Sequence, residues 1–130
     1  MRVALDPGTH KCGWAVECDL PFPVPLGTAN LDNLGAILPG LRRFFKVAEV
    51  LVGDGTNAEE VAKRAREAFS DVPVRLVDET GSTEEARRLY LLKEGSWAPR
   101  WLRYLHFLIL NPPLDGYAAW ALLRRHQAVP

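Results

Sequence analysis

The sequence predicts an α/β protein with a mixed five-stranded sheet, whose first three strands are antiparallel, and with helices on both faces. Two observations lead to this class: strand-like stretches with short turns fill most of residues 2–30, and strands and helices then alternate to about residue 94. This order implies a mixed sheet covered by helices. A length of 130 residues, 48% of them hydrophobic, suits one domain (residues 1–130) with an ordinary buried core.

The first three strands are expected to pair in order along the chain. Residues 2–6 form a short apolar strand that ends on Asp6, and the turn residues 7–9 lead into a second strand, residues 12–18. Several prolines precede a third strand near residues 25–30, which is expected at an edge because proline is tolerated there. The residues expected on one face of the second strand are Cys12, Trp14, Val16 and Cys18.

Helices and strands alternate in the next part of the chain. Residues 32–46 have a helical apolar pattern, with Asp32 as the candidate N-cap and with Pro39 expected to split or kink the helix. Residues 49–53 are a continuous apolar stretch, which is typical of a buried parallel strand. Residues 73–78 predict a further strand.

Two more helices begin with capping-box patterns, in which a polar N-cap is followed three residues later by Glu. Asn57 with Glu60 opens the first of these helices, and Ser82 with Glu85 opens the second. The second helix is expected to run to about Glu94, because Gly95 follows it.

The charged residues and the cysteines narrow the class of protein. Basic and acidic residues number 16 each, so no overall charge points to nucleic acid. Cys12 and Cys18 would lie about 20 Å apart in one strand, too far for a disulfide between them, and free thiols fit a reducing cytosol. No apolar run reaches the roughly 20 residues of a membrane span, and the first residues lack a signal-peptide pattern. We therefore expect a cytoplasmic protein with no membrane association.

Three acidic residues occupy similar places in the expected fold. Asp6 ends the first strand, Glu79 follows the last parallel strand, and Asp115 opens a final helix. Because ligands gather at the strand ends of open α/β sheets, these carboxylates can converge. Each also has a simpler interpretation: Asp6 as a turn residue, and Glu79 and Asp115 as acids that complement a helix dipole.

A cluster of carboxylates is unfavourable unless a positive charge lies between its members. Hard oxygen ligands suit Mg²⁺ or Mn²⁺, and two such ions can activate water and stabilise the leaving oxygen in phosphodiester cleavage. No Ser/His/Asp or Cys-x-x-Cys pattern competes with this interpretation. The acids therefore favour a metal-dependent nuclease.

The motifs around these acids resemble a known family. Residues 5–16 (LDPGTHKCGWAV) are similar to the first-strand motif of the RuvC and YqgF (RuvX) families. Residues 77–86 resemble the YqgF stretch Asp-Glu-Arg-Leu-Ser/Thr-Thr-x-x-Ala, and residues 115–119 resemble its closing Asp-Ser/Ala-x-Ala-Ala helix. Residues 52–56 are similar to its middle strand and Gly-containing loop. One departure is Thr80, which stands where the family usually has Arg.

The resemblance implies a ribonuclease H-like fold in which Asp6, Glu79 and Asp115 are the catalytic residues and the metal ligands. It implies phosphodiester hydrolysis in nucleic acid, either at the 5′ end of a ribosomal RNA precursor or in Holliday junctions. The expected partners are therefore structured RNA or branched DNA, and the expected cofactor is Mg²⁺ or Mn²⁺.

Two other functions stay open at this point. A catalytically weak nucleic-acid-binding or scaffolding protein would fit Thr80 and the balanced charge. The first hairpin also resembles the phosphate-binding hairpin of the actin, Hsp70 and sugar-kinase superfamily. Those proteins clamp ATP between two such domains, which 130 residues cannot supply.

The contacts to nucleic acid are expected from local groups of side chains. Residues 96–111 are aromatic and are not assigned to an element, and within them residues 97–107 fit either a stacking surface for single strands or a flap that closes the core. A dimer interface is a third interpretation of this segment, so a homodimer stays open. The candidate phosphate contacts are Thr9, Lys11, Arg87, Arg100 and Arg103.

Overall fold

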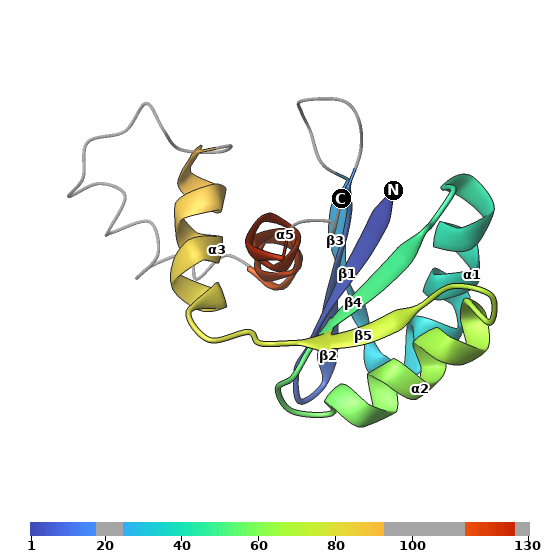
Figure 1. Ribbon diagram of the computed structural model, residues 1–130. Coiled ribbons are helices and arrows are strands. Elements are labelled where there is room, and N and C mark those ends of the chain that lie inside the picture. Colours follow the sequence, from blue (N-terminus) through green and yellow to red (C-terminus); the bar gives the residue numbers. More distant parts are fainter. Residues whose placement is uncertain (18–24, 93–113, 127–130) are drawn as a thin grey trace.

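The computed structural model describes residues 1–17, 25–92 and 114–126, and its centre is a five-stranded sheet in the order β3-β2-β1-β4-β5 (Figure 1). Neighbours within β3-β2-β1 are antiparallel, whereas β1, β4 and β5 are parallel. The predicted mixed sheet with an antiparallel start is therefore confirmed, and β3 is an edge strand as expected. The strands are β1 (Arg2–Pro7), β2 (Lys11–Val16), β3 (Leu26–Asn30), β4 (Glu49–Gly53) and β5 (Val74–Val77).

The register of the sheet brings the C-terminal ends of β1, β4 and β5 to the same end of the sheet. Asp6, near the end of β1, lies opposite Gly13 in β2. In the parallel part of the sheet, Val52 pairs with Leu5, and Gly53 pairs with Val77. Residues that follow β4 and β5 are thereby placed next to the end of β1.

Helices cover both faces of the sheet, as predicted (Figure 1). On one face lie α1 and α2, and on the other lies α5, with α3 packed against the outer side of α5. Helix α5 is therefore enclosed between the sheet and α3. The helices are α1 (Leu34–Phe44), α2 (Ala58–Ala68), α3 (Ser82–Tyr90) and α5 (Asp115–Arg125).

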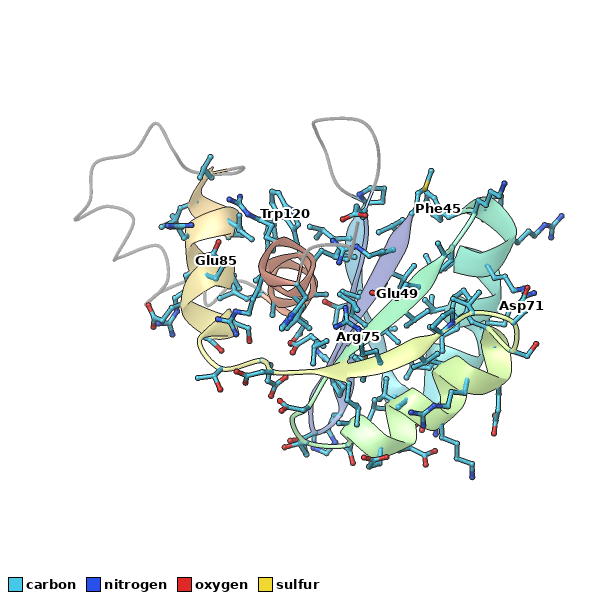
Figure 2. All side chains as sticks on the ribbon, in the orientation of Figure 1. Phe45, Glu49, Asp71, Arg75, Glu85 and Trp120 are labelled. Atoms are coloured by element: carbon cyan, nitrogen blue, oxygen red, sulfur yellow. The ribbon has the colours of Figure 1, made fainter. Side chains whose placement is uncertain are left out.

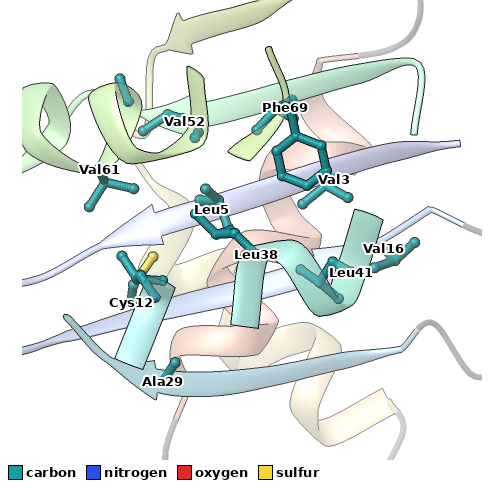
Figure 3. Packing of buried hydrophobic residues seen from close by; sticks show 14 residues of the cluster. Val3, Leu5, Cys12, Val16, Ala29, Leu38, Leu41, Val52, Val61 and Phe69 are labelled. Carbon is teal, nitrogen blue, oxygen red and sulfur yellow. The ribbon is translucent and has the colours of Figure 1, made fainter. Parts of the chain in front are cut away.

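Each face of the sheet has its own hydrophobic core. Under α1 and α2, Leu5 packs with Leu38 and Phe69 (Figure 3). Three of the four residues predicted for one face of β2 belong to this side: Cys12 and Val16 are buried in the cluster, and Trp14 is partly buried and packs against the cluster. Cys18 lies outside the described residues. The opposite face presents the small side chains Ala4 and Ala15, so that α5 can approach the sheet closely. Alternate residues of β1 and β2 therefore pack into different cores, one on each face of the sheet.

The start of the first helix differs from the prediction. Asp32 lies in a short 3-10 helix, Leu31–Asn33, and Asn33 is the N-cap residue of α1 without a side-chain cap bond. Pro39 lies inside α1, which continues past it to Phe44. Asp32 is therefore not the cap, and Pro39 does not split the helix.

Both predicted capping boxes are also wrong. Asn57 occupies the N-cap position of α2 without a side-chain cap bond, and Glu60 instead pairs with Arg64 across one helical turn at 3.1 Å. At α3 the N-cap residue is Gly81, in the left-handed region at φ 80°, and Ser82 is already the first helical residue. The Asn57 amide instead donates to main-chain oxygens of Gly8 and Thr9, and Glu85 pairs with Arg88 at 3.0 Å.

Several predictions fall on parts of the chain that are not described. The aromatic segment 96–111 and the expected helix end near Glu94 lie there, while the described part of α3 ends at Tyr90. Cys12 is a buried free cysteine. Within the described ranges, no helix is long and apolar enough to cross a membrane.

Candidate functional site

The carboxyl groups of Asp6 and Glu79 lie within hydrogen-bonding distance of each other at the C-terminal end of β1. Burial of Asp6, its side-chain hydrogen bond with Glu79, and the charges of Glu79 and Asp115 raise the pKa of Asp6 from 3.8 to about 8. Asp6 therefore keeps its proton at neutral pH, because burial and the neighbouring acids disfavour its charged form. The structure thus brings Asp6 together with Glu79 and places Asp115 near enough for its charge to act on them.

Two glycines in and after β4 make room for the Glu79 carboxylate. A Cβ atom built on Gly55 would lie 1.9 Å from Glu79 Oε1, and one built on Gly53 would lie 2.7 Å from Oε2. The main-chain N–H of Glu79 donates to Asp54 Oδ1 at 3.3 Å. The segment Gly53-Asp54-Gly55 therefore cradles Glu79 and directs it toward the end of β1.

Another glycine determines how closely Asp115 approaches. A Cβ atom on Gly13 would lie 1.8 Å from the main-chain oxygen of Asp115, so the first turn of α5 rests directly on β2. Gly13 is the partner of Asp6 in the β1–β2 pairing. The contact at Gly13 therefore brings the start of α5 close to Asp6. Any larger residue at position 13 would push the helix away.

Asn57 links two loops at the same edge of the sheet. It adopts a left-handed backbone conformation with φ 62°, and its Nδ2 donates to the main-chain oxygens of Gly8 at 2.9 Å and Thr9 at 3.2 Å. These two acceptors lie in the turn after Asp6. The amide therefore ties the turn after β1 to the loop after β4.

Thr80 stabilises the turn between β5 and α3. Its Oγ1 and its main-chain N–H donate to Asp78 Oδ1 at 2.7 and 2.9 Å. These bonds hold the pKa of Asp78 below its usual value. Thr80 thus has a local structural role beside Glu79.

The chemistry of this site fits a hard divalent cation. All three predicted ligands are carboxylates, and Glu79 Oε2 is buried with no hydrogen-bond partner. An orphaned anionic oxygen beside a second, strongly perturbed carboxyl group is destabilising unless a cation balances it. As they stand, the described residues contain no group of three or more His, Cys, Asp or Glu side chains in ligating geometry. The metal set therefore remains a prediction.

The predicted phosphate contacts are scattered over the described surface. Thr9 and Lys11 are exposed, and Lys11 lines a cavity of about 590 Å³ beside β3. Arg87 is half-exposed and pairs with Glu84 at 3.0 Å. Arg100 and Arg103 lie outside the described residues. The structure thus does not gather these five residues into one surface, and they stay predictions.

Sequence reasoning missed three residues that shape this site: Asp54, Gly55 and Asn57. Gly55 and Asn57 belong to loop and cap patterns that many proteins share, so their sequence alone gave no sign of a contact with a distant segment. The nearest sequence signal was the resemblance of residues 52–56 to a family loop.

The sheet order and the helices on both faces, with two acids at strand ends and one at the start of α5, define a ribonuclease H-like protein. No family model matches the chain. A curated protein of Corynebacterium jeikeium (strain K411), named "Putative pre-16S rRNA nuclease", is 33% identical over 105 residues, which cover 68% of this chain and 67% of that protein. The chain therefore belongs to the YqgF (RuvX) family.

Proposed function

We propose that this protein is a divalent-metal-dependent nuclease that hydrolyses phosphodiester bonds in RNA, and that its substrate is the 5′ region of a ribosomal RNA precursor. The observation that carries the proposal is the contact between Asp6 and Glu79, with the orphaned oxygen of Glu79 and the charge of Asp115 beside it. The printed name of the Corynebacterium relative supports RNA as the substrate.

Asp6, Glu79 and Asp115 would hold Mg²⁺ or Mn²⁺ in this site. When bound, the metal would polarise a phosphate oxygen and lower the pKa of a water molecule. The chain itself supplies three positioning elements for these carboxylates. The glycine cradle orients Glu79, the close contact at Gly13 sets the approach of Asp115, and Asn57 fixes the turn after Asp6.

The metal-free site holds a proton that metal binding must release. The pKa of Asp6 is raised to about 8, so at neutral pH most Asp6 side chains carry a proton. Ligation requires that both carboxylates be ionised. Metal affinity should therefore increase with pH across the neutral range.

The test is cleavage of labelled precursor RNA, single-stranded DNA and junction DNA in parallel, with Mg²⁺, Mn²⁺ or EDTA. We expect RNA cleavage that needs metal and is lost in Asp6→Asn. The matched control is Asp32→Asn, which removes one exposed acid from the 3-10 helix before α1 and should leave cleavage intact. Cleavage in EDTA, or by Asp6→Asn at the parent rate, would refute the proposal.

Two other outcomes would redirect it. Preferential cleavage of junction DNA would make branched DNA the substrate. RNA binding without cleavage in either metal would indicate a binding or scaffolding protein on the same fold.

A further inference from the structure

A groove of about 770 Å³ lies between α3 and α5, on the face of the sheet that these helices cover. Its charged residues come from the exposed sides of both helices, and Figure 2 shows Glu85 on α3 next to α5. Four arginines and two glutamates line it, in a chain whose formal net charge is zero. These charged residues are Glu84, Glu85, Arg87, Arg88, Arg124 and Arg125.

The glutamates do not balance the arginines of this groove. Glu84 pairs with Arg87, and Glu85 pairs with Arg88, each at 3.0 Å. Among the described residues, Arg124 has its ion-pair contact with the carboxylate of Glu85, at 4.0 Å, so that one acid faces two guanidinium groups. Within the described ranges the groove thus carries two more positive than negative side chains.

Arg125 connects the groove to the segment that carries Glu79. Its Nη1 donates to the main-chain oxygen of Asp78 at 3.4 Å, and its other guanidinium nitrogen lies 3.1 Å from the Cβ position of Gly81. Glu79 lies between these two residues in the chain. The positive groove therefore begins beside the segment that carries Glu79.

We propose that this groove binds the phosphodiester backbone of the RNA strand that enters the site, with Arg124 and Arg125 as its principal phosphate contacts. The inference rests on the proposed function and names the surface that holds the substrate. Guanidinium groups bind phosphate oxygens in paired hydrogen bonds. The existing pairs are exposed, with side-chain exposures of 50% for Arg87 and 49% for Arg124, and exposed pairs are weak enough for phosphates to replace.

The experiment measures binding of fluorescein-labelled oligouridylate in EDTA, over a range of salt concentrations, to the full chain and to Arg124→Gln/Arg125→Gln. Each phosphate contact on a single strand contributes about 0.7 to the slope of log affinity against log salt. Losing two contacts should lower the slope by about 1.4. The double lysine variant keeps both charges and should retain most of it.

The matched control is Lys63→Gln/Arg66→Gln, which removes the same charge from exposed positions of α2 on the opposite face of the sheet. We expect its slope to equal that of the parent. Equal losses of slope in both glutamine variants would show an effect of net charge and would refute the proposed binding groove. A parent protein that binds no RNA would also refute it. Thermal melts verify that every variant is folded.

Cleavage of precursor RNA separates this inference from the proposed function. If the parent cleaves RNA but the Arg124/Arg125 variant binds with an unchanged slope, the groove is refuted and the nuclease stands. If RNA binds through the groove but is not cleaved with either metal, the nuclease function fails and the groove stands.

Discussion

The carboxylate of Glu79 fills the space into which any side chain at Gly55 would project, because a Cβ atom there would lie 1.9 Å from Glu79 Oε1. The atom it would meet is the far end of a flexible side chain. A substitution at Gly55 can therefore be accommodated by movement of Glu79, with the sheet and helices unchanged. A substitution at Gly55 should therefore move a candidate metal ligand without changing the stability of the fold.

Gly55→Ala should displace the Glu79 carboxylate and abolish most metal-dependent cleavage while the protein stays folded. The measurement is RNA cleavage together with the shift in Tm on adding Mn²⁺, and both should fall together. Gly35→Ala is the control, because no atom lies within 4 Å of its Cβ position in α1. It should keep cleavage and gain up to about 1 kcal/mol from helix propensity. A Gly55→Ala variant with parental cleavage would contradict the cradle.

The pH dependence of stability should reveal the raised pKa of Asp6. Its folded-state value of about 8 lies above the ordinary 3.8, so the folded chain holds this proton more tightly than the unfolded chain does. The resulting stabilisation is fully present below about pH 4 and is lost as the pH rises to about 8. Urea denaturation in EDTA at about pH 5, 7 and 9 should show this loss in the parent and not in Asp6→Asn.

Asp71→Asn provides a comparison of opposite sign. The hydrogen bond from Arg42 holds the pKa of the exposed Asp71 carboxyl below its usual value. Its stabilisation is present above the ordinary pKa and is lost as the pH falls. The loss of stability across the neutral pH range should therefore persist in Asp71→Asn. If this variant lost no stability over that range, Asp6 would not be the cause of the loss in the parent.

Metal should stabilise the parent more than Asp6→Asn. Without metal the variant should be at least as stable as the parent at neutral pH, because it removes an ionisable group from a crowded acidic site. Mn²⁺ at 100 times its dissociation constant should add about 2.7 kcal/mol to the free energy of unfolding of the parent, and much less to that of the variant. If Asp6 were a turn residue only, its loss would cost about 1 kcal/mol and both proteins would respond to metal alike.

Arg2 should be the most costly charged residue to remove. Its side chain is 7% exposed, pairs with Glu17 at 2.5 Å, and donates to the main-chain oxygens of Leu123 and His126 at the end of α5. Arg2→Leu should lower the free energy of unfolding by roughly 2–3 kcal/mol, since it leaves those carbonyls and Glu17 without their donor. Chemical denaturation measures the difference.

Arg75→Leu is the matched control for Arg2, because Arg75 pairs with Glu49 at 3.1 Å on the surface (Figure 2). Its side chain is 45% exposed, so its removal should cost less than about 1 kcal/mol. Equal losses for the two variants would mean that Arg2 does not hold the end of α5.

The sheet could be predicted from sequence because its signals are local. Leu5, Val16 and Val52 alternate or cluster with the periods that strands require, and each lies in the core. The caps could not be predicted in the same way. Asn57 lies in a sequence typical of a helix cap, yet its amide donates to the turn after β1. The local sequence pattern cannot indicate a partner that is so distant in the chain.

The residue types of the candidate site, at two strand ends and one helix start, could be predicted from the sequence, but their geometry could not. Asp6, Glu79 and Asp115 could be selected because each follows or opens a recognisable element. Their spacing depends on close approaches at Gly13 and Gly55, which arise only when distant segments meet. The raised pKa of Asp6 is likewise a property of the folded chain.

Helix α5, enclosed between the sheet and α3, carries Asp115 at its first residue and Arg124 and Arg125 in its last turn. All three leave the ribosome after the whole sheet has been synthesised. A nascent chain that ends before α5 therefore has Asp6 and Glu79 but neither Asp115 nor the arginines proposed to bind the RNA strand. On the proposed function, cutting of RNA is withheld during translation until α5 has been synthesised and has packed against the sheet.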